Sequence, residues 1–157
     1  MIMRFVKFHE LETERLLLRK LQMEDVYEYY ERLFGDADVT RYMDVEPHQD
    51  ISESLESLQR ILDRYEEEDY YCWALEAKEE EGLMGLIKLM RFDPRENSCS
   101  VAYLLGCNYR NKGYATEALK EVLRFAFEEL EVERIVADHM APNAASGRVM
   151  EKAGMQH

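Results

Sequence analysis

The sequence predicts a mixed α/β (α+β) fold built on a mostly antiparallel sheet, and three observations support this class. Strand-like segments follow one another with turn residues between them, which is typical of an antiparallel meander. An amphipathic helix and a further strand then complete a strand–helix–strand unit, which requires a parallel pair. At 157 residues the chain is expected to form a single domain, residues 1–157.

The first part of the chain predicts one short strand followed by two helices. Leu11–Leu21 indicates a strand around three consecutive leucines, and a helical pattern begins at Met23. Gly35–Asp38 interrupts this helix, and a longer helix follows Pro47. The residues expected on the apolar sides are Val26, Tyr29, Tyr30 and Leu33 in the first helix and Ile51, Leu55, Leu58, Leu62 and Tyr65 in the second.

Three strands are predicted next, over Tyr70–Ala77, Leu83–Phe92 and Ser98–Leu105. The segments between them, 78–82 and 93–97, contain the Gly, Pro, Asn and Asp residues that favour turns. We therefore expect consecutive antiparallel strands, with the side chain of Trp73 packed in the core.

The strongest helical pattern follows Gly106. Its expected core-facing stripe consists of Ala115, Ala118, Leu119, Val122, Leu123, Ala126 and Leu130. Ile135–Met140 predicts another strand, and Asn143–Ala153 predicts a final helix closed by Gly154. The strands on either side of the long helix should therefore be parallel neighbours.

Composition excludes several classes of function. The net charge of −13, from 33 acidic and 20 basic side chains, opposes nucleic-acid binding, and the excess Glu either keeps the surface soluble or attracts a basic substrate. No apolar run is long enough to span a bilayer, and the start lacks a secretory pattern, so we expect a cytoplasmic protein without a membrane partner. Three cysteines without paired Cys/His spacing predict reduced thiols and no zinc site.

The segment Asn108–Ala118 joins a strand to a helix and is the clearest candidate for a ligand site. Unpaired N–H groups and the positive end of the helix dipole favour an anion there, and Arg110 and Lys112 add positive charge. Gly113 either lets the backbone approach a ligand closely or only relieves a tight turn. Gly106 lies too far from Gly113 for a dinucleotide fingerprint, and the Gly-Lys-Ser/Thr of nucleoside-triphosphate loops is absent.

Arg110–Ala115 resembles the Arg/Gln-x-x-Gly-x-Gly/Ala signature of the GNAT N-acetyltransferase family. The longer segment Arg110–Ala118 resembles the ribosomal-protein alanine acetyltransferase (RimJ/RimL) branch of that family. Leu11–Arg19 is similar to the opening strand of this branch, and Asn143–Ser146 and Glu151–Met155 are similar to its late motifs, so nearly the whole chain is covered. The resemblance implies a twisted mixed sheet with helices on both faces. It also implies a splayed parallel strand pair that admits the pantetheine arm of CoA.

The resemblance further implies acetyl-CoA as cosubstrate, no metal, and a set of binding residues. The backbone of residues 110–115 would wrap the diphosphate. Asn143 would hydrogen-bond the cofactor arm or only cap the last helix. Ser146 would face the sulfur or remain a solvated hydroxyl. The complete expected set is Leu104, Leu105, Arg110, Asn111, Lys112, Gly113, Tyr114, Ala115, Asn143 and Ser146.

Aminolysis of a thioester requires a neutral amine, and in this family a Glu on the strand before the loop often removes its proton. Ser100 occupies that position here. The remaining alternatives for the base are Asp138 or His139 on the next strand, Glu96 from the preceding turn, or an amine that arrives neutral.

The expected catalytic set is Ser146, Asp138 and Tyr103. Tyr103 would donate a proton to the departing sulfur, although an inward-facing strand tyrosine is also typical of a core. The resemblance implies that backbone N–H groups near Tyr103 and Leu104 stabilise the oxyanion.

The resemblance thus implies an N-acetyltransferase that acts on a protein N-terminus or a small amine by direct attack in a ternary complex. A CoA-binding module without activity and an acidic interaction protein without a cofactor are the alternatives. The family usually continues with two further strands after its Gly-Phe motif, whereas this sequence stops at His157. We therefore expect that C-terminal strands are missing, or that a partner chain, such as a second copy in a homodimer, covers the sheet edge.

Overall fold

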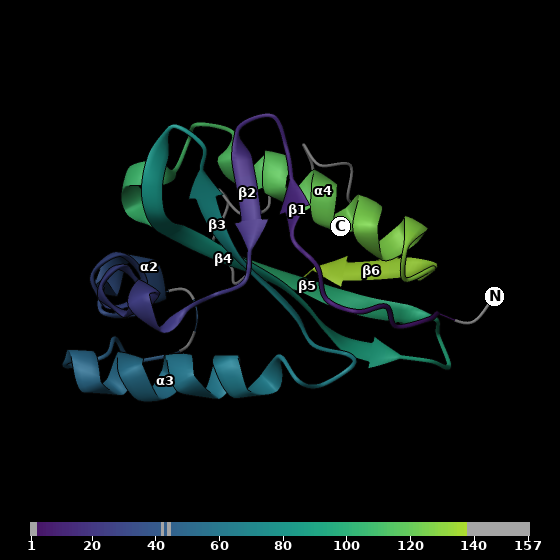
Figure 1. Ribbon diagram of the computed structural model, residues 1–157, viewed down its shortest axis with the longest axis horizontal. Helices are drawn as coiled ribbons and strands as arrows, with labels where there is room; N and C mark the ends of the chain where they lie inside the picture. Colours follow the sequence, from purple (N-terminus) through teal and green to yellow (C-terminus); the bar gives the residue numbers. More distant parts are fainter. Residues whose placement is uncertain (1–2, 42, 44, 138–157) are drawn as a thin grey trace.

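The computed structural model describes residues 3–41, 43 and 45–137, which form a six-stranded sheet with helices on both faces (Figure 1). The strands lie in chain order and are β1 (Leu11–Glu12), β2 (Leu16–Arg19), β3 (Tyr71–Ala77), β4 (Glu80–Asp93), β5 (Ser98–Leu105) and β6 (Arg134–Ala137). Neighbours from β1 to β5 pair antiparallel, whereas β5 and β6 pair parallel. The predicted fold class is therefore confirmed.

The helices divide between the two faces of this sheet. They are the 3₁₀ turn η1 (Met23–Asp25), α1 (Val26–Glu28), the π-helical segment η2 (Tyr29–Phe34), α2 (Ala37–Thr40), α3 (Ile51–Arg64), the 3₁₀ turn η3 (Cys107–Tyr109) and α4 (Tyr114–Glu128). Figure 1 shows α4 on the opposite side of the sheet from α2 and α3. The apolar residues accordingly form two clusters, one on each face.

The larger cluster lies between the sheet and α4 and is rich in aromatic rings. The rings of Trp73 and Phe125 meet edge to face with centroids 5.3 Å apart, and Tyr71 packs beside both. The indole Nε1 of Trp73 donates to the carbonyl of His9 at 3.0 Å, so its polar atom is also satisfied. The predicted core position of Trp73 is confirmed, since this side chain is fully buried.

α4 follows the predicted stripe closely. All seven residues expected on its core face are buried, namely Ala115, Ala118, Leu119, Val122, Leu123, Ala126 and Leu130. The predicted stripe did not include Phe125, which is fully buried and extends the apolar face by one residue. Burying these side chains against the sheet stabilises the helix more than its local propensity does.

The N-terminal strand differs from its prediction because it is a hairpin of two short strands. Leu11 pairs with Leu18, and the turn between β1 and β2 is closed by a bond from Thr13 N to Leu16 O of 2.9 Å. The hydroxyl of Thr13 accepts from Leu16 N at 3.1 Å, a side-chain turn that competes with a continuous strand.

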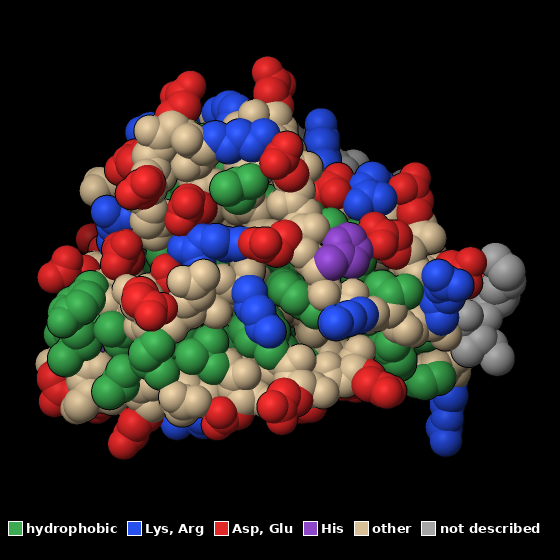
Figure 2. Space-filling model, viewed as in Figure 1, with side chains coloured by type: hydrophobic (Ala, Val, Ile, Leu, Met, Phe, Trp, Pro, Cys, Tyr) green, Lys and Arg blue, Asp and Glu red, His purple; other side chains and the backbone are tan. Residues whose placement is uncertain are grey.

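The apolar stripe predicted for the second helix is partly wrong. Ile51 and Leu55 are 38% and 44% exposed, whereas Leu58 is fully buried. The helix is rotated because Ser54 faces inward, where its hydroxyl lies 2.6 Å from Nδ1 of His48. Figure 2 accordingly shows apolar side chains on the surface around α3, among interspersed acidic and basic groups.

Two strand boundaries also differ. β4 begins at Glu80 instead of Leu83, and its pairing with β3 shifts register where Gly82 adopts a φ of +108°. β6 covers Arg134–Ala137, while the remainder of the predicted strand and the predicted last helix, 143–153, lie outside the described residues.

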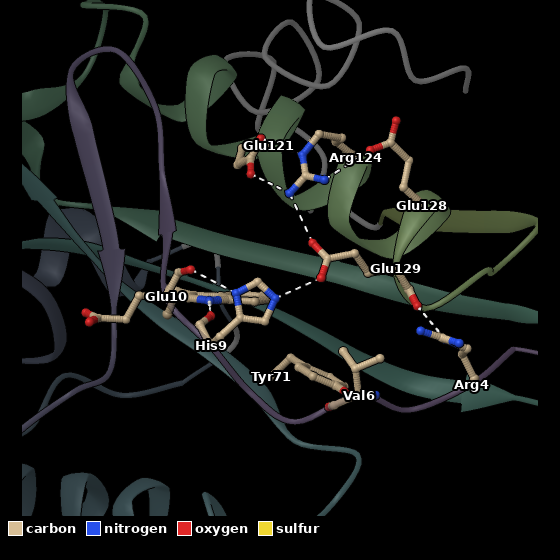
Figure 3. A network of polar contacts seen from close by, with 10 residues as sticks. Arg4, Val6, His9, Glu10, Tyr71, Glu121, Arg124, Glu128 and Glu129 are labelled. Carbon is tan, nitrogen blue, oxygen red and sulfur yellow. Dashed lines mark hydrogen bonds and ion pairs between the residues drawn. The ribbon is translucent and has the colours of Figure 1, made fainter.

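The segment before β1 makes contacts that no sequence pattern predicts. Arg4 N donates to Leu130 O at 2.8 Å, and the phenol of Tyr71 is hydrogen-bonded to the backbone of Val6. Figure 3 shows His9 between Glu10 and Glu129, close to the end of α4. These bonds fasten residues 3–10 across one face of the fold.

Across the described ranges, no helix combines the length and the apolar character that a bilayer span requires. Cys72 and Cys99 are buried, Cys107 is partly exposed, and each is a free cysteine in the structure.

Candidate cofactor-binding site

The segment between β5 and α4 turns sharply and is exposed. The turn η3 ends at Arg110, whose backbone is extended, and Asn111 then adopts a φ of +62°. Gly113 follows with φ +82° and ψ 2°, a left-handed conformation that glycine adopts without steric cost. Residues 110–113 are all exposed, so this backbone is open to a ligand.

The N–H groups of this turn have no protein acceptor within the part of the chain that the structure describes. The amides of residues 111–116 donate no hydrogen bond there, and the helical pattern begins with Glu117 N, which donates to Gly113 O at 3.0 Å. α4 is 15 residues long, so the positive end of its dipole adds to these free donors. The arrangement is suited to bind an anion through backbone groups.

The hairpin between β1 and β2 holds this turn from the side. Arg15 Nη1 donates to the carbonyl of Lys112 at 2.9 Å, and Arg15 Nε donates to Oε1 of Glu117 at 2.7 Å. The other carboxylate oxygen of Glu117 accepts from Arg15 N at 2.8 Å and from the hydroxyl of Thr13. The Arg15 guanidinium also lies over the ring of Tyr114, 4.4 Å from its centroid.

The contacts between Arg15 and Glu117 favour the charged form of both side chains. Partial burial alone would raise the pKa of Glu117, but its bonds to Thr13 and Arg15 hold the pKa below its usual value. The same ion pair raises the pKa of Arg15. Both side chains are therefore charged at neutral pH, and the carboxylate is neutralised locally.

A cluster of two aspartates and one cysteine lies beside the turn, on the side of α2. Asp36, Asp38 and Cys107 each place one potential metal-ligand atom within 4.8 Å of the others. The carboxylate of Asp36 already accepts from Asp38 N at 2.8 Å as the cap of α2, and an Arg110 guanidinium nitrogen lies 3.5 Å from the carbonyl of Asp38. These contacts give the cluster a structural role.

Along β5, the backbone N–H and C=O groups of successive residues point alternately toward β4 and toward the side of β6. Gly106 N donates to Met84 O at 2.9 Å, and the register from Leu105 back to Ser100 is continuous. Because the polar groups of an antiparallel strand alternate in direction, those of Leu104 face β4, whereas those of Tyr103 and Leu105 face the side of β6. The amide of Leu104 is thus directed toward β4, and the amide of Tyr103 is directed toward the side of β6.

The described part of β6 lies beside the first half of β5. The parallel pairs run from Ser98–Arg134 to Val101–Ala137, where the described part of β6 also ends. The side chain of Tyr103 is partly buried against the core beneath α4, and the side chain of Leu105 is buried there.

One of the alternatives for the base, Glu96, lies far from the turn between β5 and α4. Glu96 lies in the turn that precedes β5, whereas the candidate site follows the end of that strand. Eight extended residues separate the two positions by about 25 Å.

Several predicted residues come together and others cannot be placed. Arg110, Asn111, Lys112, Gly113, Tyr114 and Ala115 form the exposed turn and the first residues of α4. Asp138, His139, Asn143 and Ser146 lie outside the described residues. Sequence reasoning assigned no role to Thr13, Arg15 and Glu117, although all three lie within the segments that resemble the family. Their proximity arises from contacts about a hundred residues apart, which a sequence pattern does not reveal.

Comparisons with known proteins agree with this geometry. The family model described as acetyltransferase (GNAT) domain matches residues 15–156. The chain is 30% identical over 146 residues to the uncharacterized N-acetyltransferase p20 of Bacillus licheniformis, covering 93% of this chain and 82% of that protein. A GNAT-family acetyltransferase structure from Bacillus anthracis has a TM-score of 0.81 at 27% identity, covering 94% of this chain and 84% of the other.

A more distant structure has the same fold with ligands bound. The Microcin C7 self immunity acetyltransferase MccE, in complex with acetyl-CoA and AMP, has a TM-score of 0.78 at 17% identity. The match covers 90% of this chain and 79% of MccE.

Proposed function

The chain belongs to the GNAT acetyltransferase family and is an acyltransferase, and from this premise we propose that it transfers an acetyl group from acetyl-CoA to a primary amine. We propose direct attack in a ternary complex, catalysed by a single domain of residues 1–157. The unpaired cysteines are consistent with action in the reducing cytoplasm.

The free amides of residues 111–116 are the observation that carries this proposal. Among the described residues these donors at the start of α4 have no acceptor, so they are available to a diphosphate. Arg110 and Lys112, both exposed, add positive charge at the rim. The MccE structure, which contains acetyl-CoA, supports the same assignment for this fold.

In this proposal the reaction uses groups of Tyr103 in the second half of β5 and of two residues later in the chain, Asp138 and Ser146. Bound acetyl-CoA supplies the thioester carbon that the amine attacks and the thiol that departs. The amide of Tyr103, directed to the side of β6, would stabilise the developing oxyanion. The phenol of Tyr103 would give a proton to the departing thiolate, while Asp138 would accept the proton lost by the amine and Ser146 would lie beside the sulfur.

The acceptor belongs to one of two classes, a protein N-terminus or a small amine. The motif from Arg110 to Ala118 supports the ribosomal-protein branch, and hence an N-terminal amine. The net charge of −13 favours a cationic acceptor of either class, because a negatively charged protein attracts positively charged molecules.

A thiol-release assay tests the proposal. Purified protein is incubated with acetyl-CoA and, separately, with N-terminal peptides of basic proteins, polyamines and amino sugars, and free CoA is measured with a thiol reagent. We expect acceptor-dependent release with one acceptor class and a mass increase of one acetyl group on that acceptor. CoA binding without turnover on any acceptor would contradict the proposed transfer and leave a binding module.

A further inference from the structure

We propose that Arg15 is a positioning residue for the donor, which acts by holding the anion-binding turn and neutralising Glu117. The inference rests on the proposed function, because the ligand it concerns is the diphosphate of acetyl-CoA. Arg15 belongs to the β1–β2 hairpin, and it reaches the turn between β5 and α4 from outside the segment that carries the amides.

The first part of this role is mechanical. The bond from Arg15 Nη1 to Lys112 O fixes the peptide that precedes Gly113, whose amide is one of the free donors. The guanidinium also lies 4.4 Å from the ring centroid of Tyr114, the first residue of α4. A β-carbon added at Gly113 would lie 3.2 Å from Arg15 Nη2, so the guanidinium and the turn are in close contact.

The second part is electrostatic. Glu117 lies in the first turn of α4, where its negative charge is attracted to the same amide groups as a diphosphate. An unpaired carboxylate there would compete for those amides and would repel the diphosphate. The structure prevents both effects, because Glu117 Oε1 accepts from Arg15 Nε and Oε2 accepts from Arg15 N and Thr13.

Arg15 therefore has a predicted effect on one part of the donor only. It should affect binding of the diphosphate and leave the acetyl-pantetheine portion untouched, since the contacts of its guanidinium with described residues lie at the turn and the first turn of α4. A residue that merely stabilised the fold would affect both portions equally.

The test compares two donors in the wild type and four variants. Initial rates are measured with acetyl-CoA and with acetyl-pantetheine, which lacks the diphosphate, for wild type, Arg15→Gln, Glu117→Gln and the double variant. Arg64→Gln is the matched control, because Arg64 also pairs with a glutamate, Glu67, and also lies 4.4 Å from the centroid of a tyrosine ring, that of Tyr70. Thermal melting of every variant records stability separately.

For Arg15→Gln we expect the KM for acetyl-CoA to rise about tenfold, the size expected for one lost charge-assisted hydrogen bond, with kcat unchanged. The KM for acetyl-pantetheine should not change. The double variant should recover most of the loss, because it has no uncompensated carboxylate beside the diphosphate. Arg64→Gln should match wild type with both donors.

Three results would overturn the inference. They are an unchanged KM for acetyl-CoA in Arg15→Gln, an equal loss with both donors, and a double variant no better than Arg15→Gln. A wild-type chain that binds no CoA would instead overturn the proposed function, and with it the role of Arg15.

Discussion

The imidazole Nε2 of His9 lies 2.8 Å from Oε1 of Glu129, and this contact joins the segment before β1 to the residue that caps the C-terminal end of α4 (Figure 3). Arg124 reaches the other oxygen of Glu129 at 3.2 Å and also pairs with Glu121 and Glu128. A carboxylate between two cationic groups makes the attachment of this segment dependent on pH.

Replacing His9 with Gln should reduce the pH dependence of stability. Partial burial alone would lower the pKa of His9, but its hydrogen bonds raise it above the usual 6.5. The stabilisation is therefore fully present below pH 6.5 and is lost as pH rises through the higher pKa of the folded state. The pKa of Glu129 is lowered, so this group remains charged throughout that range.

The measurement is the melting temperature at pH 5.5 and at pH 8.5 in low salt. We expect the wild type to lose more stability between these pH values than His9→Gln does. An identical loss in both proteins would show that the pair does not respond to pH as the geometry predicts.

Replacing Gly113 with Ala should weaken both the fold and donor binding. The left-handed backbone costs a residue with a β-carbon about 1 kcal/mol, and the added carbon would press on Arg15 Nη2. We expect melting to fall by about 3 °C and CoA affinity to fall further than this loss of stability explains. Asn111→Gly is the control, because it relieves a φ of +62° and should leave stability unchanged or higher. Unaltered CoA affinity in Gly113→Ala would contradict the binding role of the turn.

The fold was predictable where one local pattern decides the structure. The stripe of α4 and the bounds of β5 follow from periodicity, and the left-handed Gly113 follows from residue type. The exposure of Ile51 was not predictable, because the rotation of α3 depends on the buried Ser54–His48 contact. The hairpin at Leu11 was missed since a single side-chain bond from Thr13 decides it.

The candidate site was predictable to a similar degree. The family resemblance identified the turn from Arg110 to Ala115, which proves to be exposed and rich in free amides. The contact of Arg15 with Glu117 joins residues 102 positions apart and has no local signal. The direction of each amide in β5 follows from sheet register, which also has no local signal.

Removing Arg19 should destabilise the fold strongly. Its guanidinium makes two bonds to Asp25, of 2.8 and 2.9 Å, and a further one to Glu76, and Asp25 is buried. Arg19→Met leaves both carboxylates without a cation, and we expect a loss of about 3 kcal/mol in the free energy of unfolding. Lys7→Met removes a charge from an exposed position and is the control. Chemical denaturation measures both variants, and equal effects would exclude a structural role for the Arg19 cluster.

The three thiols should differ sharply in reactivity. Burial raises the pKa of Cys72 to about 11 and that of Cys99 to about 12, so neither forms a thiolate at neutral pH. Cys107 is partly exposed, and its pKa is raised as well, by partial burial first. We expect slow iodoacetamide labelling of the native protein at pH 7.5, confined to Cys107, and none in Cys107→Ser. Mass spectrometry that finds labelled Cys72 or Cys99 in native protein would refute the packing described for β3 and β5.

The central claim is that the backbone amides before and within the first turn of α4 bind the diphosphate of CoA. NMR observes these amides directly. A ¹⁵N-labelled sample titrated with CoA should show saturable shifts, largest at the amides of residues 111–116, while titration with pantetheine should leave those amides in place. If CoA produces no shift at these six amides, the turn does not bind the diphosphate and the account of this site is wrong.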